Sequence, residues 1–223
     1  MGRLAAFSMM GLARLPLSRM PGLEFWKLCG SGTGEGFTPK PNTAVWAILC
    51  VWQDHETAQA QMRASRLFQW YRKRASEHWT IHLAPTSARG VWSGRNPFQT
   101  SDTAPGDGIV ALTRATLKPR VALRFWRRVP DISRVIGANE DVLFKIGLGE
   151  VPMLHQITFS IWPDTQTMAG FARKPGPHAQ AIQAVREGKW FREELYARFR
   201  ILGDDGSWGG TRPLARLEEK ELS

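Results

Sequence analysis

The chain has 223 residues, of which 43% are hydrophobic and 22% charged, a composition typical of a globular protein. No run of about 18 apolar residues occurs, which excludes a helix that spans a bilayer. Two cysteines without metal-ligand spacing exclude a disulfide framework and a zinc site, and they indicate a reducing compartment. A net charge of +10 favours an anionic partner, either nucleic acid or a membrane surface, and ten Trp residues favour the membrane.

The first half of the chain, residues 1–85, predicts an incomplete copy of the second half. An amphipathic helix is expected first, followed by strands and one long helix. The expected elements are a helix over 4–13, strands over 25–29, 44–52 and 78–83, and a helix over 55–75. A strand equivalent to the one that opens the second half is missing, and the Gly/Pro/Ser-rich stretch 86–107 is expected to link the halves.

The second half, residues 108–210, predicts the order β-α-β-β-α-β of a ferredoxin-like split. The expected elements are strands over 108–116, 142–147, 155–162 and 199–202, and helices over 121–135, 164–172, 177–185 and 190–199. The charged tail, 211–223, is expected to be disordered.

One motif occurs twice. An apolar strand runs into Trp52-Gln53-Asp54 with Thr57 three residues after the Asp, and Trp162, Asp164 and Thr167 repeat the pattern at the same offset. An Asp that caps a helix directly after a strand is one supersecondary unit. Two copies predict an α+β protein built from tandem ferredoxin-like repeats.

Several long strings carry a resemblance to a known family. They are the residues 34–49, 144–152, 155–164, 176–179 and 190–199. From about residue 3 to residue 208, the chain resembles the spheroidene monooxygenase family, the carotenoid 2-ketolases of purple photosynthetic bacteria.

The resemblance implies a haem-dependent oxygenase with a dimeric α+β barrel architecture. It implies that O₂ and electrons from reduced ferredoxin place a keto group at C2 of acyclic carotenoids such as spheroidene. Two successive hydroxylations of one methylene and loss of water would give the ketone. Such a protein would lie at the cytoplasmic side of the inner photosynthetic membrane as a peripheral protein. Leu4, Phe7, Met10 and Leu12, with Arg3 and Arg14, would then dock the first helix, although packing on the sheet also explains these residues.

A haem oxygenase needs an axial ligand, usually His or Cys thiolate. His178 lies in the first turn of an expected helix, in phase with the apolar Ile182 and Val185, and is the leading candidate for the metal ligand. His155 shares the apolar face of its strand with Ile157 and is a candidate for a distal acid–base group or for the ligand itself. Each also fits a structural role in the core.

Other side chains are candidates for binding substrate, oxygen or the haem propionates. Gln156 offers polarity on the opposite face of the strand from His155, and Arg114 and Lys145 are expected on neighbouring strands as cations for the propionates. Cys29 and Cys50 are rival ligands, but neither precedes a helix that would stabilise a thiolate.

Two alternatives from other classes stay open. A cofactor-free monooxygenase or dehydratase of the same barrel class would bury His178 without iron, because a fold alone does not fix a function. A basic nucleic-acid-binding α+β module would use arginine clusters on phosphates, although no RNA-recognition signature is present.

Overall fold

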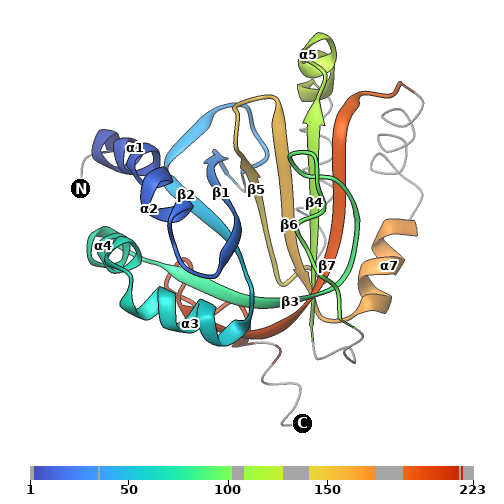
Figure 1. Ribbon diagram of the computed structural model, residues 1–223. Helices are drawn as coiled ribbons and strands as arrows, with labels where there is room; N and C mark the ends of the chain where they lie inside the picture. Colours follow the sequence, from blue (N-terminus) through green and yellow to red (C-terminus); the bar gives the residue numbers. More distant parts are fainter. Residues whose placement is uncertain are drawn as a thin grey trace.

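The computed structural model describes residues 3–34, 36–101, 108–127, 141–173, 188–215 and 217. In these ranges seven strands form one antiparallel sheet in the order β2-β1-β5-β6-β4-β7-β3, and the sheet curls round (Figure 1). The strands are β1 (Leu23–Gly32), β2 (Pro41–Trp52), β3 (Trp79–Gly90), β4 (Ile109–Leu117), β5 (Phe144–Gly149), β6 (His155–Trp162) and β7 (Phe191–Gly206). The prediction of an α+β protein is confirmed.

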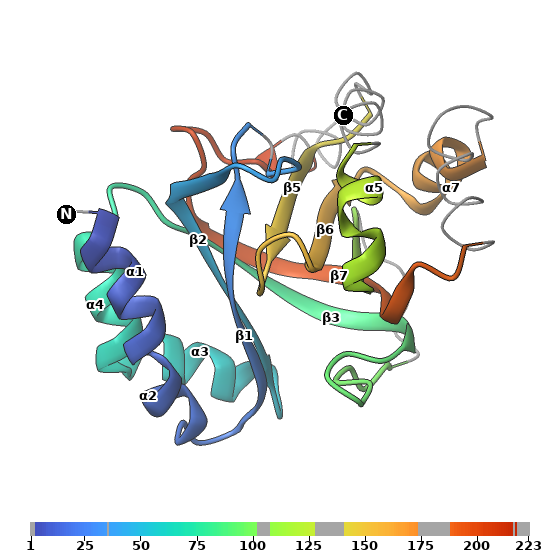
Figure 2. The same ribbon diagram turned by 90° about the horizontal axis from the view of Figure 1, so that it is seen from above.

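The helices lie outside the curl. They are α1 (Arg3–Leu12), α2 (Arg14–Ser18), α3 (His55–Ala64), α4 (Arg66–Arg74), the 3-10 turn η1 (Pro119–Val121), α5 (Ala122–Trp126) and α7 (Thr165–Arg173). Helices α1 to α4 gather beside β1 and β2, whereas α5 and α7 lie beside the strands of the second half (Figure 2). None of the described helices is long and apolar enough to cross a membrane.

The sheet has two hydrophobic cores because each face needs cover. The larger core lies inside the curl, where alternate residues such as Ile157 and Ile161 of β6 meet Leu195 and Phe199 of β7. The smaller core lies between the first-half strands and their helices, around Leu17 and residues of α4. Residues two apart on one strand therefore point inside the curl, and their neighbours point outward.

The repeated motif forms the structure that the sequence predicts. The Asp54 carboxylate accepts a hydrogen bond from the Thr57 backbone N–H at 2.6 Å, where β2 passes into α3. The Asp164 carboxylate accepts from the Thr167 N–H at 2.7 Å, where β6 passes into α7. Both copies are helix N-caps after a strand.

Two predicted helices differ from the structure. The long helix expected over 55–75 is interrupted at Ser65, which is extended (φ −65°, ψ 127°) and whose hydroxyl caps α4 by accepting from the Leu67 N–H. The helix expected over 190–199 is wrong, because this stretch belongs to β7. Its apolar residues Leu195, Ala197 and Phe199 fit a period of two, and pairing with β4 and β3 decides in favour of the strand.

The expected boundaries between segments also shift. Strand β3 continues to Gly90, inside the stretch 86–107 that was expected to be a linker. Leu214 and Leu217 are buried in the larger core, so at these positions the tail 211–223 is packed rather than disordered. The helix expected over 177–185 and most of the one expected over 121–135 lie outside the described residues.

Candidate functional site

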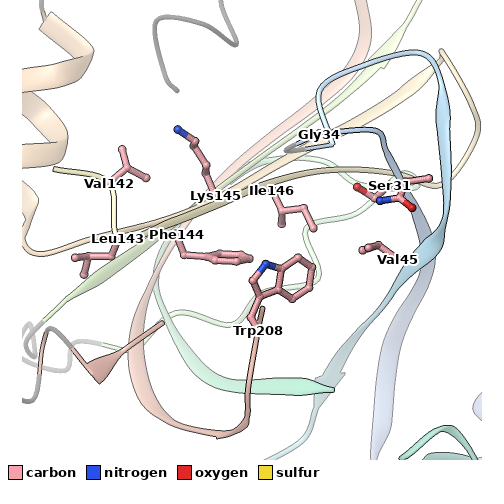
Figure 3. A pocket seen from close by; sticks show the side chains of 10 residues that line it. Ser31, Gly34, Val45, Val142, Leu143, Phe144, Lys145, Ile146 and Trp208 are labelled. Atoms are coloured by element: carbon pink, nitrogen blue, oxygen red, sulfur yellow. The ribbon is translucent and has the colours of Figure 1, made fainter. Parts of the chain in front are cut away.

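A pocket of about 390 Å³ opens where β5 diverges from β1 (Figure 3). The two strands pair only at Gly30–Gly149 and Ser31–Leu148, so the β1-facing edge of β5 toward Phe144 is left without a partner strand. The residues that line the pocket are Ser31, Gly34, Asn42, Val45, Val142, Leu143, Phe144, Lys145, Ile146 and Trp208.

Aromatic rings form one wall of the pocket. The Phe144 ring lies 5.3 Å from the indole of Trp208 and 4.7 Å from that of Trp79, both edge-on. In Figure 3 the side chains of Phe144 and Ile146 turn toward Trp208, whereas Lys145 points to the other side of the strand. Phe144 and Ile146 therefore meet Trp208 on one face of β5, and the Lys145 side chain lies on the other face. Apolar walls with a few polar groups are typical of small-molecule sites.

Glycines hold the β1–β2 loop against β5. Gly36 has a φ of +89°, and a Cβ there would lie 2.1 Å from the Gly147 carbonyl oxygen. A Cβ on Gly147 would lie 2.6 Å from the Gly36 oxygen, and the Ser31 hydroxyl donates to the Gly147 carbonyl at 2.9 Å. Only residues without a side chain permit this approach, so both glycines position one rim of the pocket.

A cluster of charged side chains lies inside the curl. Arg114 of β4 is 1% exposed, and its guanidinium lies 2.5 Å from the Glu193 carboxylate and 3.5 Å from that of Glu150. Lys27 of β1 lies 3.1 Å from Glu150, and the Trp92 indole N–H donates to Glu150 at 2.8 Å. We call Lys27, Trp92, Arg114, Glu150, His155 and Glu193 the buried charged cluster. It joins strands of both halves and balances its charges.

The cluster controls the protonation of two of its members. Burial lowers the pKa of His155, with Arg114 and Lys27 adding to the effect and Glu150 opposing it. Burial would raise the pKa of Glu193, but hydrogen bonds from Gly94, Arg114 and Ser93 hold it below its usual value. The cluster therefore favours a neutral His155 imidazole and an ionised Glu193 carboxylate.

The His155 imidazole lies beside the Glu150 carboxylate. Its Nδ1 is buried and lies 3.6 Å from Oε1 of Glu150 without a hydrogen bond. The Nδ1 atom is therefore a buried polar atom without a hydrogen-bond partner among the described residues. His155 is not among the residues that line the pocket.

The structure separates the predicted site residues by the face of the sheet. Arg114 pairs across β4–β6 with Ile157, so it shares the inner face with His155. Lys145 pairs with Ser160, so it shares the outer face with Gln156. The prediction that Arg114 and Lys145 lie on neighbouring strands is wrong, because β6 lies between β4 and β5 and the two cations point to opposite faces.

No protein-family model matches the chain. The chain is 52% identical over 220 residues to the spheroidene monooxygenase of Rhodobacter capsulatus, covering 97% of this chain and 91% of that relative. It is 52% identical over 217 residues to the spheroidene monooxygenase of Cereibacter sphaeroides, covering 95% of this chain and 66% of that relative. The chain belongs to the spheroidene monooxygenase family.

Likeness to solved structures is low. A candidate monooxygenase from Fusobacterium nucleatum covers 92% of this chain and 87% of its own at 10% identity, with a TM-score of 0.43. A score at this level carries no argument about function. The family assignment therefore rests on the sequence relatives alone.

The described residues of this family member do not complete a haem site by themselves. The residues that line the pocket include no His or Cys. Burial raises the pKa of the Cys29 thiol to about 12, and burial does the same for Cys50, which disfavours thiolate ligation by either residue. His178 lies outside the described residues.

Sequence reasoning missed most of the two sites. Trp92, Glu150 and Glu193 were assigned no role, although the family strings contain both glutamates, because residues far apart in sequence meet only through the strand order. Trp208 was assigned no role, although it forms a wall of the pocket. The family strings 34–49 and 144–152 contain a signal that was available, since each contributes residues to the pocket.

We expect Arg114→Met to lower the free energy of unfolding by roughly 3–5 kcal/mol, because it leaves the Glu193 carboxylate without its cation and leaves Glu150 with Lys27 alone. Urea denaturation measures the change. The matched control is Arg198→Met, at an exposed position of β7, which should change the free energy of unfolding by less than about 0.5 kcal/mol. Equal effects of the two substitutions would contradict the structural role of Arg114.

We expect the free energy of unfolding to fall as the pH drops below 6.5, the usual pKa of histidine. The unfolded chain takes up a proton there that folded His155, with its lowered pKa, does not, so acid favours unfolding. His82 contributes with the same sign, because burial lowers its pKa as well. His155→Gln should reduce the slope of unfolding free energy against pH, and His155→Gln/His82→Gln should reduce it further. An unchanged slope in the double variant would refute this assignment.

Proposed function

We propose that the chain is a haem-dependent carotenoid monooxygenase that places a keto group at C2 of acyclic carotenoids such as spheroidene. Two O₂-dependent hydroxylations of the same methylene, each using two electrons and releasing water, give a geminal diol that loses water to the ketone. Reduced ferredoxin supplies the electrons. Membership of the spheroidene monooxygenase family is the observation that carries the proposal.

The pocket is our proposed site for one end of the polyene. Its volume of about 390 Å³ is at the low end for small-molecule sites, so it suits a chain end rather than a whole carotenoid. Phe144, Trp79 and Trp208 offer apolar ring surface to the polyene. An end held there would keep the nearby methylene in a fixed position, as oxidation at C2 requires.

Our proposed haem site is the outer face of the sheet. His178, the proposed metal ligand, follows α7 in the chain, and Phe171 of α7 packs on Trp162 at 5.2 Å. This face carries Trp162, Gln156 and Ser160, and Ser160 pairs with Lys145 of β5. Lys145 then remains a candidate for a propionate and Gln156 for polarity near O₂. Arg114 and His155 point inside the curl, away from the proposed haem site, which favours a stabilising role for both.

The proposed architecture is a tandem pair of ferredoxin-like repeats in a dimeric α+β barrel arrangement. The order β5-β6-β4-β7 is that of a complete ferredoxin-like unit, and β1, β2 and β3 supply three strands of a second. We propose 1–85 and 108–210 as the two repeats, with β3 extending the first repeat to Gly90. We further propose a peripheral position at the cytoplasmic side of the photosynthetic membrane, where a polyene is accessible.

A cofactor-free monooxygenase or dehydratase of the same barrel class is the second candidate. One observation favours it, namely that the residues lining the pocket include no axial ligand for iron.

We expect the purified protein to show a Soret band that His178→Ala removes or shifts and His155→Ala leaves in place. The reason is that His178 is proposed on the haem side and His155 points inside the curl. Absorption spectra of the three proteins, with and without added haem, make the measurement. No Soret band after reconstitution would favour the cofactor-free candidate, and a response to His155→Ala alone would move the ligand to β6.

We expect Val45→Trp to lower carotenoid turnover at least about tenfold, because an indole at this position fills the pocket. Ala44→Trp is the matched control, since Ala44 is the exposed neighbour on the same strand and is not among the residues that line the pocket. Turnover with spheroidene is followed by the absorption change of the polyene. Equal rates for the two variants would show that the substrate binds elsewhere.

A further inference from the structure

Helices α1, α2 and α4 lie side by side on one flank of the molecule (Figures 1 and 2). The Tyr71 hydroxyl of α4 donates to the Met9 carbonyl of α1 at 3.0 Å, and Leu17 of α2 packs with Phe68 of α4. These contacts hold the three helices together as one surface. We call it the basic helical face, and its exposed residues include Leu12, Arg14, Leu15, Arg66, Lys73 and Arg74.

The charge of this face has one sign. Residues 1–23 contain three arginines and no acidic residue, and residues 57–76 contain five basic residues and no acidic residue. Helix α4 ends on the consecutive cations Arg72, Lys73 and Arg74. A concentration of positive charge without interspersed carboxylates creates a field that attracts an extended anionic surface.

Two large apolar side chains stand in this positive field. Leu12 is 67% exposed and Leu15 is 58% exposed, and they lie three residues apart on consecutive helical turns. Met10, for which the sequence leaves docking and packing open, is packed, because it is 7% exposed and its sulfur accepts a hydrogen bond from the Tyr71 hydroxyl. Among the side chains that the structure describes on this face, Leu12 and Leu15 are the large apolar ones that face solvent.

An aromatic ring adds to the face. The Arg74 guanidinium lies 4.4 Å from the centre of the Trp70 ring, and Trp70 is half-buried. A cation over an indole neutralises little of its charge, so the guanidinium keeps its attraction for anions. Indole and arginine together are typical of residues at a lipid–water boundary.

We propose that the basic helical face docks on an anionic lipid bilayer, with Leu12 and Leu15 at the acyl boundary and the cations of α4 at the lipid phosphates. Two exposed leucines inside a cationic surface fit a bilayer, which offers apolar depth beneath anionic headgroups. An acidic protein offers the charge without that depth. The choice of a membrane rests on the proposed function in one respect, because a polyene substrate is held in membranes.

Vesicle co-sedimentation of the full chain tests the proposal. Phosphatidylcholine vesicles are compared with vesicles that also contain phosphatidylglycerol. Wild type should bind the anionic vesicles and lose binding as salt rises. Lys73→Glu/Arg74→Glu and Leu12→Ser/Leu15→Ser should each lower the vesicle partition coefficient at least about tenfold.

Matched controls on the other half of the molecule complete the design. Leu123→Ser removes an equally exposed leucine (68%) from α5, and Arg192→Glu reverses an exposed cation of β7. Both should bind as wild type does. Far-UV circular dichroism checks that every variant is folded.

The outcomes separate this inference from the proposed oxygenase. Vesicle binding that is absent, or that the control variants weaken as much as the face variants, would overturn the docking surface whatever the activity of the protein. Weaker reduction by ferredoxin in Lys73→Glu/Arg74→Glu, with vesicle binding unchanged, would assign the face to the electron donor instead. A missing Soret band with intact vesicle binding would reject haem alone.

Discussion

Arg114 and its two carboxylates lie where elements from both halves of the chain meet inside the curled sheet. Arg114 comes from β4, Glu193 from β7 and Glu150 from the connection after β5, while Lys27 of β1 contacts Glu150 from the first half. A buried cation must keep its anions, so these elements must stay in register with one another. The short β1–β5 pairing adjoins this cluster, and the two strands separate beyond it to leave the pocket.

The two faces of the sheet divide stability from proposed chemistry. The inner face carries the buried charged cluster and the larger core, whereas the outer face carries Lys145 and Gln156, where we propose the haem site. The geometry of a sheet produces this division, because alternate residues of each strand point to opposite sides. The pocket lies beside β5, whose residues Phe144 and Lys145 belong to opposite faces.

The sequence predicted those elements whose signals are local. Strand β6 was predicted with its observed bounds, and both Asp caps were predicted from the repeated motif, because a cap depends on residues three apart. The helix predicted over 190–199 was wrong because this stretch satisfies helical and strand periods alike. Only pairing with β4 and β3 decides in favour of the strand. Arg114 was named as a candidate, but its partners could not be found, since Glu193 and Glu150 approach it only through strand order.

Strands β2 and β3 are the two edges of the sheet, and an edge strand can recruit a strand from another molecule. Part of the β3 edge is protected by the chain itself. The Ser101 N–H donates to the Pro85 carbonyl at 3.3 Å, and the Asn96 amide donates to the Ala88 carbonyl at 3.4 Å. Pro85 has no N–H to offer, and the pairing register with β7 shifts beside it. These features leave less of the β3 edge available as a template for aggregation, because a foreign strand needs a continuous row of free N–H and C=O groups to pair with.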